Sequence, residues 1–256
     1  MSRSSSSEWS SRFTELARNV PWASDAMRGL IDDLACAMHF DVRVMLSGER
    51  GVGKTFVARM IHRGSRRGAR PFVRVAASAM WESLHAAAGA PSPLQRHHAV
   101  LQRISTGTLL VDHMDAILPA AQRLLVEFIE RAAARRGGVR LITAMGPDVY
   151  ARVRAEAFDE HLFYRLNLIH LMIPPLRDRP EDIPLLFRGY LSHYTAGRAP
   201  ELSMSACERL VAYSWPGNVK ELKEVAMNVA RANLRSPVVD EDLLPLPSDV
   251  AANLEP

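Results

Sequence analysis

The part of this chain best suited to chemistry is a glycine-rich segment with the features of a phosphate-binding loop. It matches the pattern G-x-x-x-x-G-K-[ST] at every fixed position, with the residues Gly48, Glu49, Arg50, Gly51, Val52, Gly53, Lys54 and Thr55. Glycines let the backbone fold closely around an anion, and amides at the start of a helix direct positive dipoles at it. Lys54 can reach the outer phosphates, and Thr55 can offer its hydroxyl to Mg2+. We therefore predict that ATP or ADP binds here with Mg2+.

The residues on both sides of this loop predict the elements that must position it. Residues 41–47 form an apolar run typical of a buried strand, and residues 56–62 have the pattern of a helix. A glycine turn that precedes a helix by chance is the alternative interpretation. The agreement of all fixed positions with both flanking elements favours the nucleotide site.

A further residue of the same site is predicted at the end of another strand. Residues 108–111 form a short strand-like run that is followed by Asp112, where an acid can organise a metal ion beside the phosphate loop. Many aspartates at strand ends are only solvated. Because Asp112 occurs together with Lys54 and Thr55, we predict that Thr55 and Asp112 bind Mg2+.

Strand and helix signals alternate through most of the chain and then change. Further strands are predicted at residues 71–75 and 139–143, with helical patterns between strands. Strands separated by helices imply a mostly parallel sheet with its ligand at the carboxyl ends. Helices follow Pro175 at about 182–194, 205–213 and 218–234. They predict a small all-helical domain, in which Asn218 is the N-cap of the last helix.

Composition bounds the class of protein. The 256 residues are 48% hydrophobic, enough for one large domain or a large domain with a small companion. No apolar run is long enough to cross a bilayer and no signal peptide is evident, so we expect a cytoplasmic location and no membrane partner. The net charge of +4 is spread over mixed acidic and basic residues, which does not predict nucleic-acid binding. Cys36 and Cys207 lie far apart, which argues against a disulfide or zinc site.

Several strings of residues place these motifs in one family. They are Leu46–Lys54, Gly107–Asp112, Tyr164–Asn167, Pro174–Ile183 and Trp215–Leu222. On these strings the chain resembles, from about Ala23 to Leu244, the AAA+ central domain of bacterial enhancer-binding proteins, which activate sigma-54 RNA polymerase. The resemblance implies an α/β P-loop AAA+ three-layer sandwich with a mostly parallel sheet, followed by a small all-helical lid domain. It also implies ring hexamers that hydrolyse ATP between subunits and remodel the sigma-54 closed complex with pore loops.

The resemblance and the composition together divide the chain into segments. We expect a Ser-rich, disordered segment at 1–22, an AAA+ nucleotide-binding domain at 23–175, a lid domain at 176–246 and a tail at 247–256. No helix-turn-helix is expected after the lid and no receiver or sensor domain before Ser24. Direct DNA binding is therefore not expected.

Residues that the family uses for hydrolysis are replaced in this chain. The family's Walker B strand ends Asp-Glu, and the Glu polarises the attacking water, whereas Asp112 is followed by His113. The family couples that Glu to an Asn after a string like P-F-V-x-V, whereas this chain has Ala76 there. An imidazole can accept a proton but differs from a carboxylate in charge and reach. His113 is therefore a candidate base, and the alternative is that it takes no part.

Positions that contact the γ-phosphate in the family are replaced as well. The resemblance places a sensor I Asn at Gly146 and one of two arginine fingers at Asp159. An acid at the second position would repel the transferring phosphoryl group. Arg165 corresponds to the other arginine finger, and Lys220 corresponds to the sensor II arginine without its bidentate fork. Both could instead serve only in salt bridges.

The pore loops of the family also have no counterpart of the same composition. The G-A-F-T-G-A loop that touches sigma-54 aligns with residues 88–93, where the aromatic and the threonine are absent and two prolines stand. Between Gln122 and Val139 the chain is shorter than the family by roughly one hairpin, where the second pore loop sits. We therefore expect that this protein does not open promoters by the family's usual route.

Three functions are compatible with this pattern. In the first, the protein binds nucleotide, hydrolyses ATP slowly or not at all, and regulates sigma-54-dependent transcription in a ring with itself or an intact relative, reaching sigma-54 RNA polymerase indirectly. In the second, it is a working ATPase that remodels another partner, using His113 and arginines such as Arg152 or Arg154 in trans. In the third, it is an ATP-independent scaffold. The intact phosphate loop favours the first.

Overall fold

The computed structural model describes most of the chain, in two compact units. The described residues are 23–78, 106–117, 119, 122, 125–126, 138–198, 200–232 and 237–246. Among them, the first unit contains residues 30–48 and 54–173, and the second contains residues 23–29, 49–53 and those from 174 onward. The expectations for residues 1–22, for the pore-loop residues 88–93, for most of the stretch between Gln122 and Val139 and for the tail at 247–256 lie outside the described residues.

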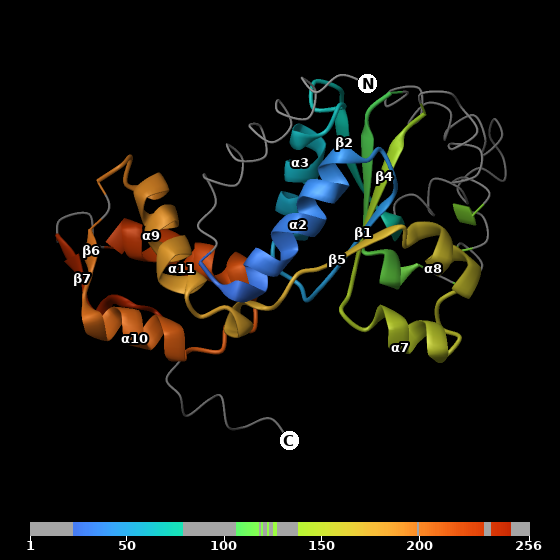
Figure 1. The fold of residues 1–256 in the computed structure, drawn as a ribbon. Helices are drawn as coiled ribbons and strands as arrows, with labels where there is room; N and C mark the ends of the chain where they lie inside the picture. The colour runs from blue at the N-terminus through green and yellow to red at the C-terminus, as the bar shows by residue number, and fades with distance from the viewer. Residues whose placement is uncertain are drawn as a thin grey trace, which may run out of the picture. The chain divides into compact units, whose positions relative to one another are not determined.

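The first unit is built on a five-stranded parallel sheet (Figure 1). Its strands are β1 (Val44–Ser47), β2 (Phe72–Ala76), β3 (Thr108–Asp112), β4 (Arg140–Met145) and β5 (Ile169–Met172). They lie in the order β2-β3-β4-β1-β5, and every neighbouring pair is parallel. The predicted parallel sheet is confirmed, and the four predicted strands agree with β1 to β4 within a few residues.

The three inner strands are buried, and the two edge strands, β2 and β5, are not. Every residue of β1, β3 and β4 is buried, as expected of parallel strands that helices cover on both faces. In β5, which lies at the edge of the sheet, Leu171 alone is fully buried. The sequence analysis did not predict this strand, although residues 168–173 are apolar except for His170.

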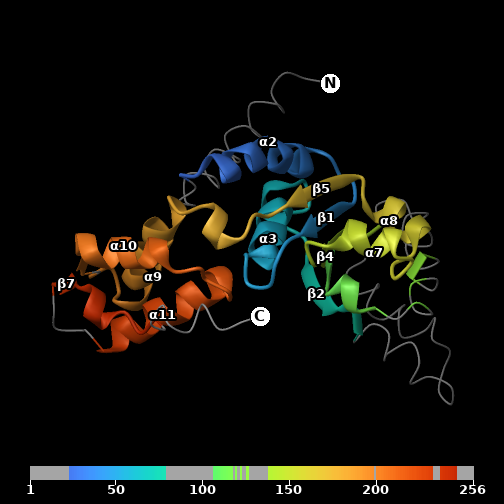
Figure 2. The same cartoon turned by 90° about the horizontal axis from the view of Figure 1, so that it is seen from below.

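Helices cover both faces of this sheet (Figure 2). On one face α3 (Lys54–Gly64) contacts β1, β3 and β4, and α2 (Asp25–His39) meets α3 where Met38 lies against Gly64. On the other face α7 (Val149–Arg154) and α8 (Glu160–Leu166) share an apolar core with β1, β3 and β4. The first unit is therefore the three-layer α/β/α sandwich that was predicted.

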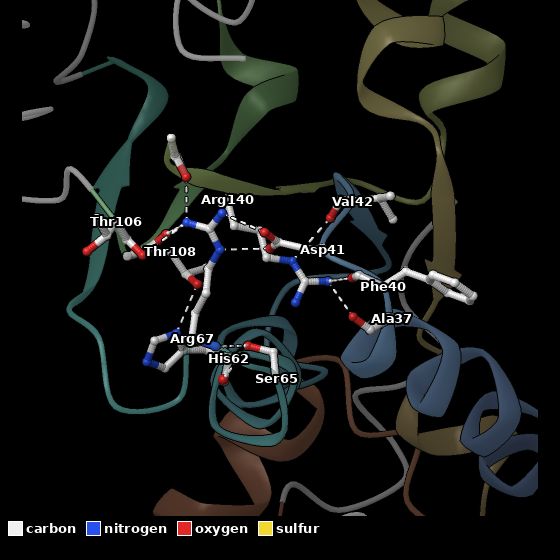
Figure 3. A network of polar contacts seen from close by, with 12 residues as sticks. Ala37, Phe40, Asp41, Val42, His62, Ser65, Arg67, Thr106, Thr108 and Arg140 are labelled. Carbon is white, nitrogen blue, oxygen red and sulfur yellow. Dashed lines mark hydrogen bonds and ion pairs between the residues drawn. The ribbon is translucent and has the colours of Figure 1, made fainter. Parts of the chain in front are cut away.

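Two arginines hold the amino-terminal end of the sheet (Figure 3). Arg67 forms an ion pair with Asp41, with Nη2 2.6 Å from Oδ2. It also donates to the backbone carbonyl oxygens of Thr106, Gly107 and Gly138. Arg140, the first residue of β4, donates to the carbonyl oxygens of Ala37, Phe40 and Val42. Burial lowers the pKa of Arg140 to about 10, and these bonds offset the cost of burying its charge.

The second unit is mostly helical. It contains the 3-10 helix η2 (Leu176–Asp178), α9 (Asp182–Tyr194), α10 (Met204–Ala212), α11 (Asn218–Ala232) and the 3-10 helix η3 (Glu241–Leu243). The apolar faces of η2, α9, α10 and α11 form one core, in which Phe187 and Trp215 are fully buried. The three predicted helices are confirmed to within one or two residues. The prediction of a purely helical region missed β6 (Glu201–Leu202) and β7 (Val238–Val239), which pair in parallel, because two-residue strands carry no detectable period.

Candidate functional site

The predicted phosphate loop is a tight turn that connects β1 to α3. Three of its residues have positive φ: Gly48 at 147°, Gly51 at 81° and Gly53 at 108°. Glycine adopts such angles without the steric cost that a Cβ imposes. Lys54 begins α3, and its Nζ donates to the carbonyl oxygen of Gly48 at 2.6 Å. The ammonium group therefore lies against the loop, next to the helix start where an anion would bind.

The middle of the loop belongs to the second unit and packs there against the turn at Gly217. A Cβ at Gly51 would lie 2.1 Å from the carbonyl oxygen of Gly217, and the backbone N–H of Lys220 donates to the carbonyl oxygen of Gly51 at 3.2 Å. A Cβ at Gly53 would meet no described atom within 4 Å. Gly51 is therefore required by its φ and by a close backbone approach, whereas Gly53 is required by its φ alone.

Within the second unit, two side chains contact loop residues Glu49 and Arg50. Arg177 contacts Glu49 in a paired arrangement, Nη1 to Oε2 at 2.9 Å and Nη2 to Oε1 at 2.5 Å, and these bonds raise the pKa of Arg177. Asn218 donates from Nδ2 to Oε2 of Glu49 and to the carbonyl oxygen of Arg50, both at 3.0 Å. Its Oδ1 accepts from the backbone N–H of Leu176 at 2.7 Å. One buried amide thus ties the loop to η2.

A buried arginine contacts the next residue of the loop. Arg179 is 3% exposed, and its Nη2 donates to the carbonyl oxygen of Val52 at 3.1 Å. Burial lowers the pKa of Arg179, and the nearby carboxylate of Asp182 opposes this shift. Asp182 is fully buried and accepts from the backbone N–H groups of Ala23 and Ser24 at 2.6 and 2.9 Å. Residues from 177 to 220 of the second unit therefore contact each of its loop residues from Glu49 to Val52.

Asn218 begins α11 as predicted, but its side chain does not cap the helix. The amide is used by the contacts to η2 and the loop. The carboxylate of Glu221 instead accepts from the backbone N–H of Gly217 at 2.7 Å and from the hydroxyl of Tyr213 at 3.0 Å. Asn218 has φ of 54°, a left-handed conformation that asparagine tolerates better than most residues. The N-cap prediction was wrong because the amide is hydrogen-bonded to η2 and the loop, so it does not bond to the backbone N–H groups of α11.

Lys220 contacts the loop through its backbone N–H. Its side chain is 77% exposed, and Nζ lies 4.0 Å from Oε1 of Glu224 on the same helix. An exposed pair of this kind contributes little to stability. Contact between the Lys220 ammonium group and a nucleotide stays a prediction.

Asp112 ends β3 as predicted, and it is paired with an arginine of the neighbouring strand. Its Oδ2 accepts from Nε of Arg74 at 3.0 Å and from Nη2 of Arg74 at 2.6 Å. The side chain of Asp112 is 8% exposed and that of Arg74 is 50% exposed. Ala76 pairs with Asp112 in the sheet, so Arg74, two residues earlier on β2, projects from the same face as the carboxylate.

The strand register places this carboxylate at the carboxyl end of the sheet, where the loop begins. Ser47 pairs with Met145, and Val111 pairs with Thr143, so β1, β4 and β3 end at nearly the same level. Asp112 therefore lies two strand spacings, about 10 Å, from the strand that leads into the loop. Strand ends of a parallel sheet are where ligands of this fold class bind.

His113, at the position of the Walker B Glu, has a left-handed backbone with φ of 58° and ψ of 45°. Its backbone N–H donates to Oδ1 of Asp112 at 3.0 Å, and its Nδ1 lies 3.5 Å from the same oxygen. The side chain is 49% exposed. Such a conformation costs a non-glycine residue about 1 kcal/mol, and the bonds to Asp112 offset that cost.

Asp159 has a structural role at the start of α8. It is the N-cap residue, and its Oδ1 accepts from the backbone N–H of Leu162 at 2.7 Å. Its own backbone N–H donates to Oε1 of Gln122 at 2.6 Å. An acid at this position also suits the positive end of the helix dipole. The acid at this predicted arginine-finger position is therefore explained without a nucleotide.

Gly146 follows β4 in a crowded acidic corner. A Cβ there would lie 2.8 Å from Oδ1 of Asp148 and 3.3 Å from Oδ2 of Asp115. An asparagine at this position would therefore require these side chains to move. Arg165 is exposed on α8. It contributes, after burial, to lowering the pKa of Arg43.

The sequence analysis missed the residues that hold the loop. The strings Pro174–Ile183 and Trp215–Leu222 identified the family, but Arg177, Arg179 and Asn218 received no role at the loop. The available signal was two arginines at a spacing of two in a segment between apolar residues. Arg74 was missed because it occupies the variable position of the string P-F-V-x-V.

Neither a membrane span nor a clustered metal site is found in the part of the chain that the structure describes. None of its helices is both long and apolar enough to cross a bilayer. None of its His, Cys, Asp and Glu side chains form a group of three or more that could hold a metal ion.

Comparison of the sequence with known families gives two matches that together span most of the chain. Residues 21–172 match the Sigma-54 interaction domain, and residues 177–253 match the AAA+ ATPase lid domain. The regulatory protein AtoC of Escherichia coli K12 is 35% identical over 240 residues, which are 87% of this chain and 52% of AtoC. The transcriptional regulatory protein ZraR of Klebsiella oxytoca is 35% identical over 241 residues, which are 87% of this chain and 54% of ZraR. The chain thus spans about half the length of these relatives.

Solved structures with the same fold include NtrX from Brucella abortus. Its complex with ATP has a TM-score of 0.74 at 25% identity, over 91% of this chain and 58% of NtrX. Its complex with ADP has a TM-score of 0.73 at 26% identity, over 89% of this chain and 56% of NtrX. Together with the two family matches, these similarities show that the chain belongs to the Sigma-54 interaction domain family of AAA+ proteins.

Proposed function

We propose that this protein is a regulator of sigma-54-dependent transcription that holds ATP or ADP in the loop Gly48–Thr55 and hydrolyses ATP slowly or not at all. One observation carries the proposal. The loop keeps its positive-φ glycines and Lys54, while the position of a predicted arginine finger is occupied by an acid that caps α8. Residues 23–175 would form the nucleotide-binding domain, and residues 176–246 the lid.

Nucleotide binding is supported by the loop and by a relative. NtrX from Brucella abortus was solved with ATP and with ADP, and this chain has the same fold. The loop's positive-φ glycines and the start of α3 present the backbone amides that phosphate requires. Contacts from Arg177, Arg179 and Asn218 hold the loop in shape, which reduces the entropy that a ligand must remove on binding.

Slow or absent hydrolysis is supported by the replacements at the strand ends. The chain has His113 and Ala76 where the family pairs Glu with Asn, and Gly146 offers no amide. Arg152, a candidate finger in trans, donates from Nη2 to the carbonyl oxygen of Asp115 at 2.9 Å within its own chain. In the family, the Glu and Asn polarise the attacking water and an arginine finger stabilises charge in the transition state, and both contributions are large in phosphoryl transfer.

Assembly with copies of itself, or with an intact family member, is the proposed mode of action. Exposed apolar side chains on α7, on α8 and around β5 support it, because such groups mark surfaces that associate. They are Tyr150, Tyr164, Leu168 and Met172. Sigma-54 RNA polymerase would be reached through the assembly.

Calorimetric titration with ATP tests the binding half of this proposal. Wild type should bind ATP saturably, and Lys54→Ala should weaken binding by about a hundredfold or more, because a cation that contacts the outer phosphates in a desolvated site is lost. Lys223→Ala, which removes an exposed lysine of α11, is the matched control and should leave affinity unchanged. No saturable binding by wild type would contradict the proposal and favour the ATP-independent scaffold.

Steady-state turnover, measured over a series of protein concentrations, tests the hydrolysis half. We expect a rate near background at all concentrations for wild type. The double variant His113→Glu with Ala76→Asn restores the pair that polarises water and should turn over faster than wild type. A wild-type rate that rises steeply as the protein associates would instead identify an active ATPase.

A further inference from the structure

The Asp112 carboxylate, which the sequence assigns to Mg2+, does not fit a metal ion in this structure. Both of its oxygens have donors. Oδ2 accepts from Nε and Nη2 of Arg74, and Oδ1 accepts from the backbone N–H of His113. Oδ2, which accepts twice, has no lone pair left for a metal ion, and Oδ1 has one. A metal ion on that lone pair would lie beside the guanidinium group, whose positive charge repels it.

Charge adds to this competition. Arg74 contacts the carboxylate through two nitrogens, the geometry in which guanidinium pairs are strongest. The Asp112 side chain is 8% exposed, so water screens the pair little on that side. With His113 in place of a second carboxylate, the strand end has one acid and one arginine, whose charges balance without a metal. A dication beside Arg74 would add repulsion between the two cations.

The position of Arg74 suits it to contact phosphate. Phe72, Arg74 and Ala76 alternate along β2 and share a face. His62 of α3 packs on Phe72, with ring centroids 5.3 Å apart, so this is the face that α3 covers. The helix that begins with Lys54 and Thr55 therefore lies over the face from which Arg74 projects. With half of its side chain exposed, Arg74 keeps donors available for an anion.

From these contacts we infer that Arg74 replaces the metal ion, so that this protein binds nucleotide without Mg2+, with the guanidinium of Arg74 and the ammonium of Lys54 supplying the positive charge. The inference rests on the proposed nucleotide binding at the loop. It also gives a reason for slow hydrolysis, since a fixed guanidinium can neutralise phosphate but cannot orient water through a coordination shell as a metal does.

ATP titration of the full chain with excess Mg2+ and with excess EDTA tests the inference. For wild type, the affinities for ATP in EDTA and in Mg2+ should differ by less than about threefold. Arg74→Gln removes the charge but keeps a polar side chain, and should weaken binding in EDTA by about tenfold while changing binding in Mg2+ by less than about threefold, because a metal can then take the place at Asp112. Arg59→Gln is the matched control. This substitution removes another exposed arginine of the same face, which is stacked 4.8 Å from the centroid of the Phe72 ring. The variant should have the same ratio of ATP affinities in EDTA and in Mg2+ as wild type.

Three other outcomes would overturn the inference. Binding by wild type that requires Mg2+ would contradict it while leaving the proposed nucleotide function intact. An unchanged ratio of affinities in Arg74→Gln would show that Arg74 does not replace the metal. Absence of binding in both conditions would remove the nucleotide function and this inference together. Because Arg74 is half exposed, thermal melting should show all variants to be folded.

Discussion

The side-chain amide of Asn218 is hydrogen-bonded to the carboxylate of Glu49 across 169 residues of sequence, Nδ2 to Oε2 at 3.0 Å. The same nitrogen donates to the carbonyl oxygen of Arg50, and the amide oxygen accepts from Leu176. The turn before α11, the segment at η2 and the phosphate loop therefore meet at one buried side chain. Nucleotide affinity and the stability of the second unit should depend on the same residue.

Replacing Asn218 should destabilise the protein strongly. Asn218→Ala removes three hydrogen bonds from a fully buried site and puts alanine at a φ of 54°. We expect a loss of about 3 kcal/mol in the free energy of unfolding, measured with urea. Asn218→Gly loses the same bonds but tolerates the φ, and should be less destabilising than Asn218→Ala by about 1 kcal/mol. Equal effects of the two substitutions would mean that the left-handed backbone carries no cost here.

The two glycines inside the loop should respond differently to alanine. Both have positive φ, but only at Gly51 would the added Cβ meet the backbone of Gly217, at 2.1 Å. Gly53→Ala should cost about 1 to 2 kcal/mol through φ alone. Gly51→Ala should cost at least about 2 kcal/mol more, since two backbone segments must separate. Urea unfolding of both variants gives the comparison, and equal losses would contradict the close approach of the loop to the turn.

The features of the fold and the site that could be predicted from the sequence are those that depend on residues close together in the chain. The loop, β3 and its terminal Asp112 were predictable because their pattern is local: glycines, an apolar run and a fixed spacing. The loop's supports were not, because Asn218 and Arg179 act over more than a hundred residues and carry no local signal. The same reason explains the N-cap error at Asn218, whose local preference for a cap lost to a tertiary contact. β5 was missed because its apolar residues follow the apolar end of α8 with only Asn167 between them, so no turn signal separates the strand from the helix.

Two arginines of one short segment, Arg177 and Arg179, differ in burial, so replacing each of them tests how burial affects the free energy of unfolding. Arg179 is 3% exposed and bonds to the Val52 carbonyl, whereas the side chain of Arg177 is 46% exposed in its pair with Glu49. Arg179→Ala should lower the free energy of unfolding by about 3 kcal/mol or more, because it leaves a buried carbonyl and a cavity. Arg177→Ala should cost less than about 1 kcal/mol, as exposed ion pairs do. Chemical denaturation distinguishes the two, and a larger effect at Arg177 would reverse this interpretation.

The role of Asp159 as a helix cap is open to a conservative test. Asp159→Ala should destabilise the protein by about 1 kcal/mol, because the N–H of Leu162 loses its acceptor. Asp159→Asn keeps a capping oxygen and should stay within about 0.5 kcal/mol of wild type. If Asp159→Arg, which restores the family's residue type, gave strong ATP turnover without loss of stability, the capping explanation for this acid would be wrong.

One buried and one half-buried histidine, His62 and His170, should make the protein less stable as the pH falls. Nδ1 of His62 is hydrogen-bonded to Oγ1 of Thr108 at 2.9 Å. Nε2 of His170 is hydrogen-bonded to Oγ of Ser47 at 2.7 Å, and its Nδ1 to Oη of Tyr150 at 2.9 Å. Burial lowers the pKa of both imidazoles. The unfolded chain therefore takes up protons first as the pH falls below about 6.5, and each histidine lowers the free energy of unfolding by at most about 1.4 kcal/mol per pH unit until it protonates in the folded state. Their contribution is fully present above the unfolded pKa and is lost as the pH falls toward the folded pKa.

Urea unfolding at a series of pH values between about 7 and 5 should show this slope. His62→Gln and His170→Gln should each make the slope shallower, and the double variant should make it shallower still. A slope that neither substitution changes would assign the acid sensitivity to other groups.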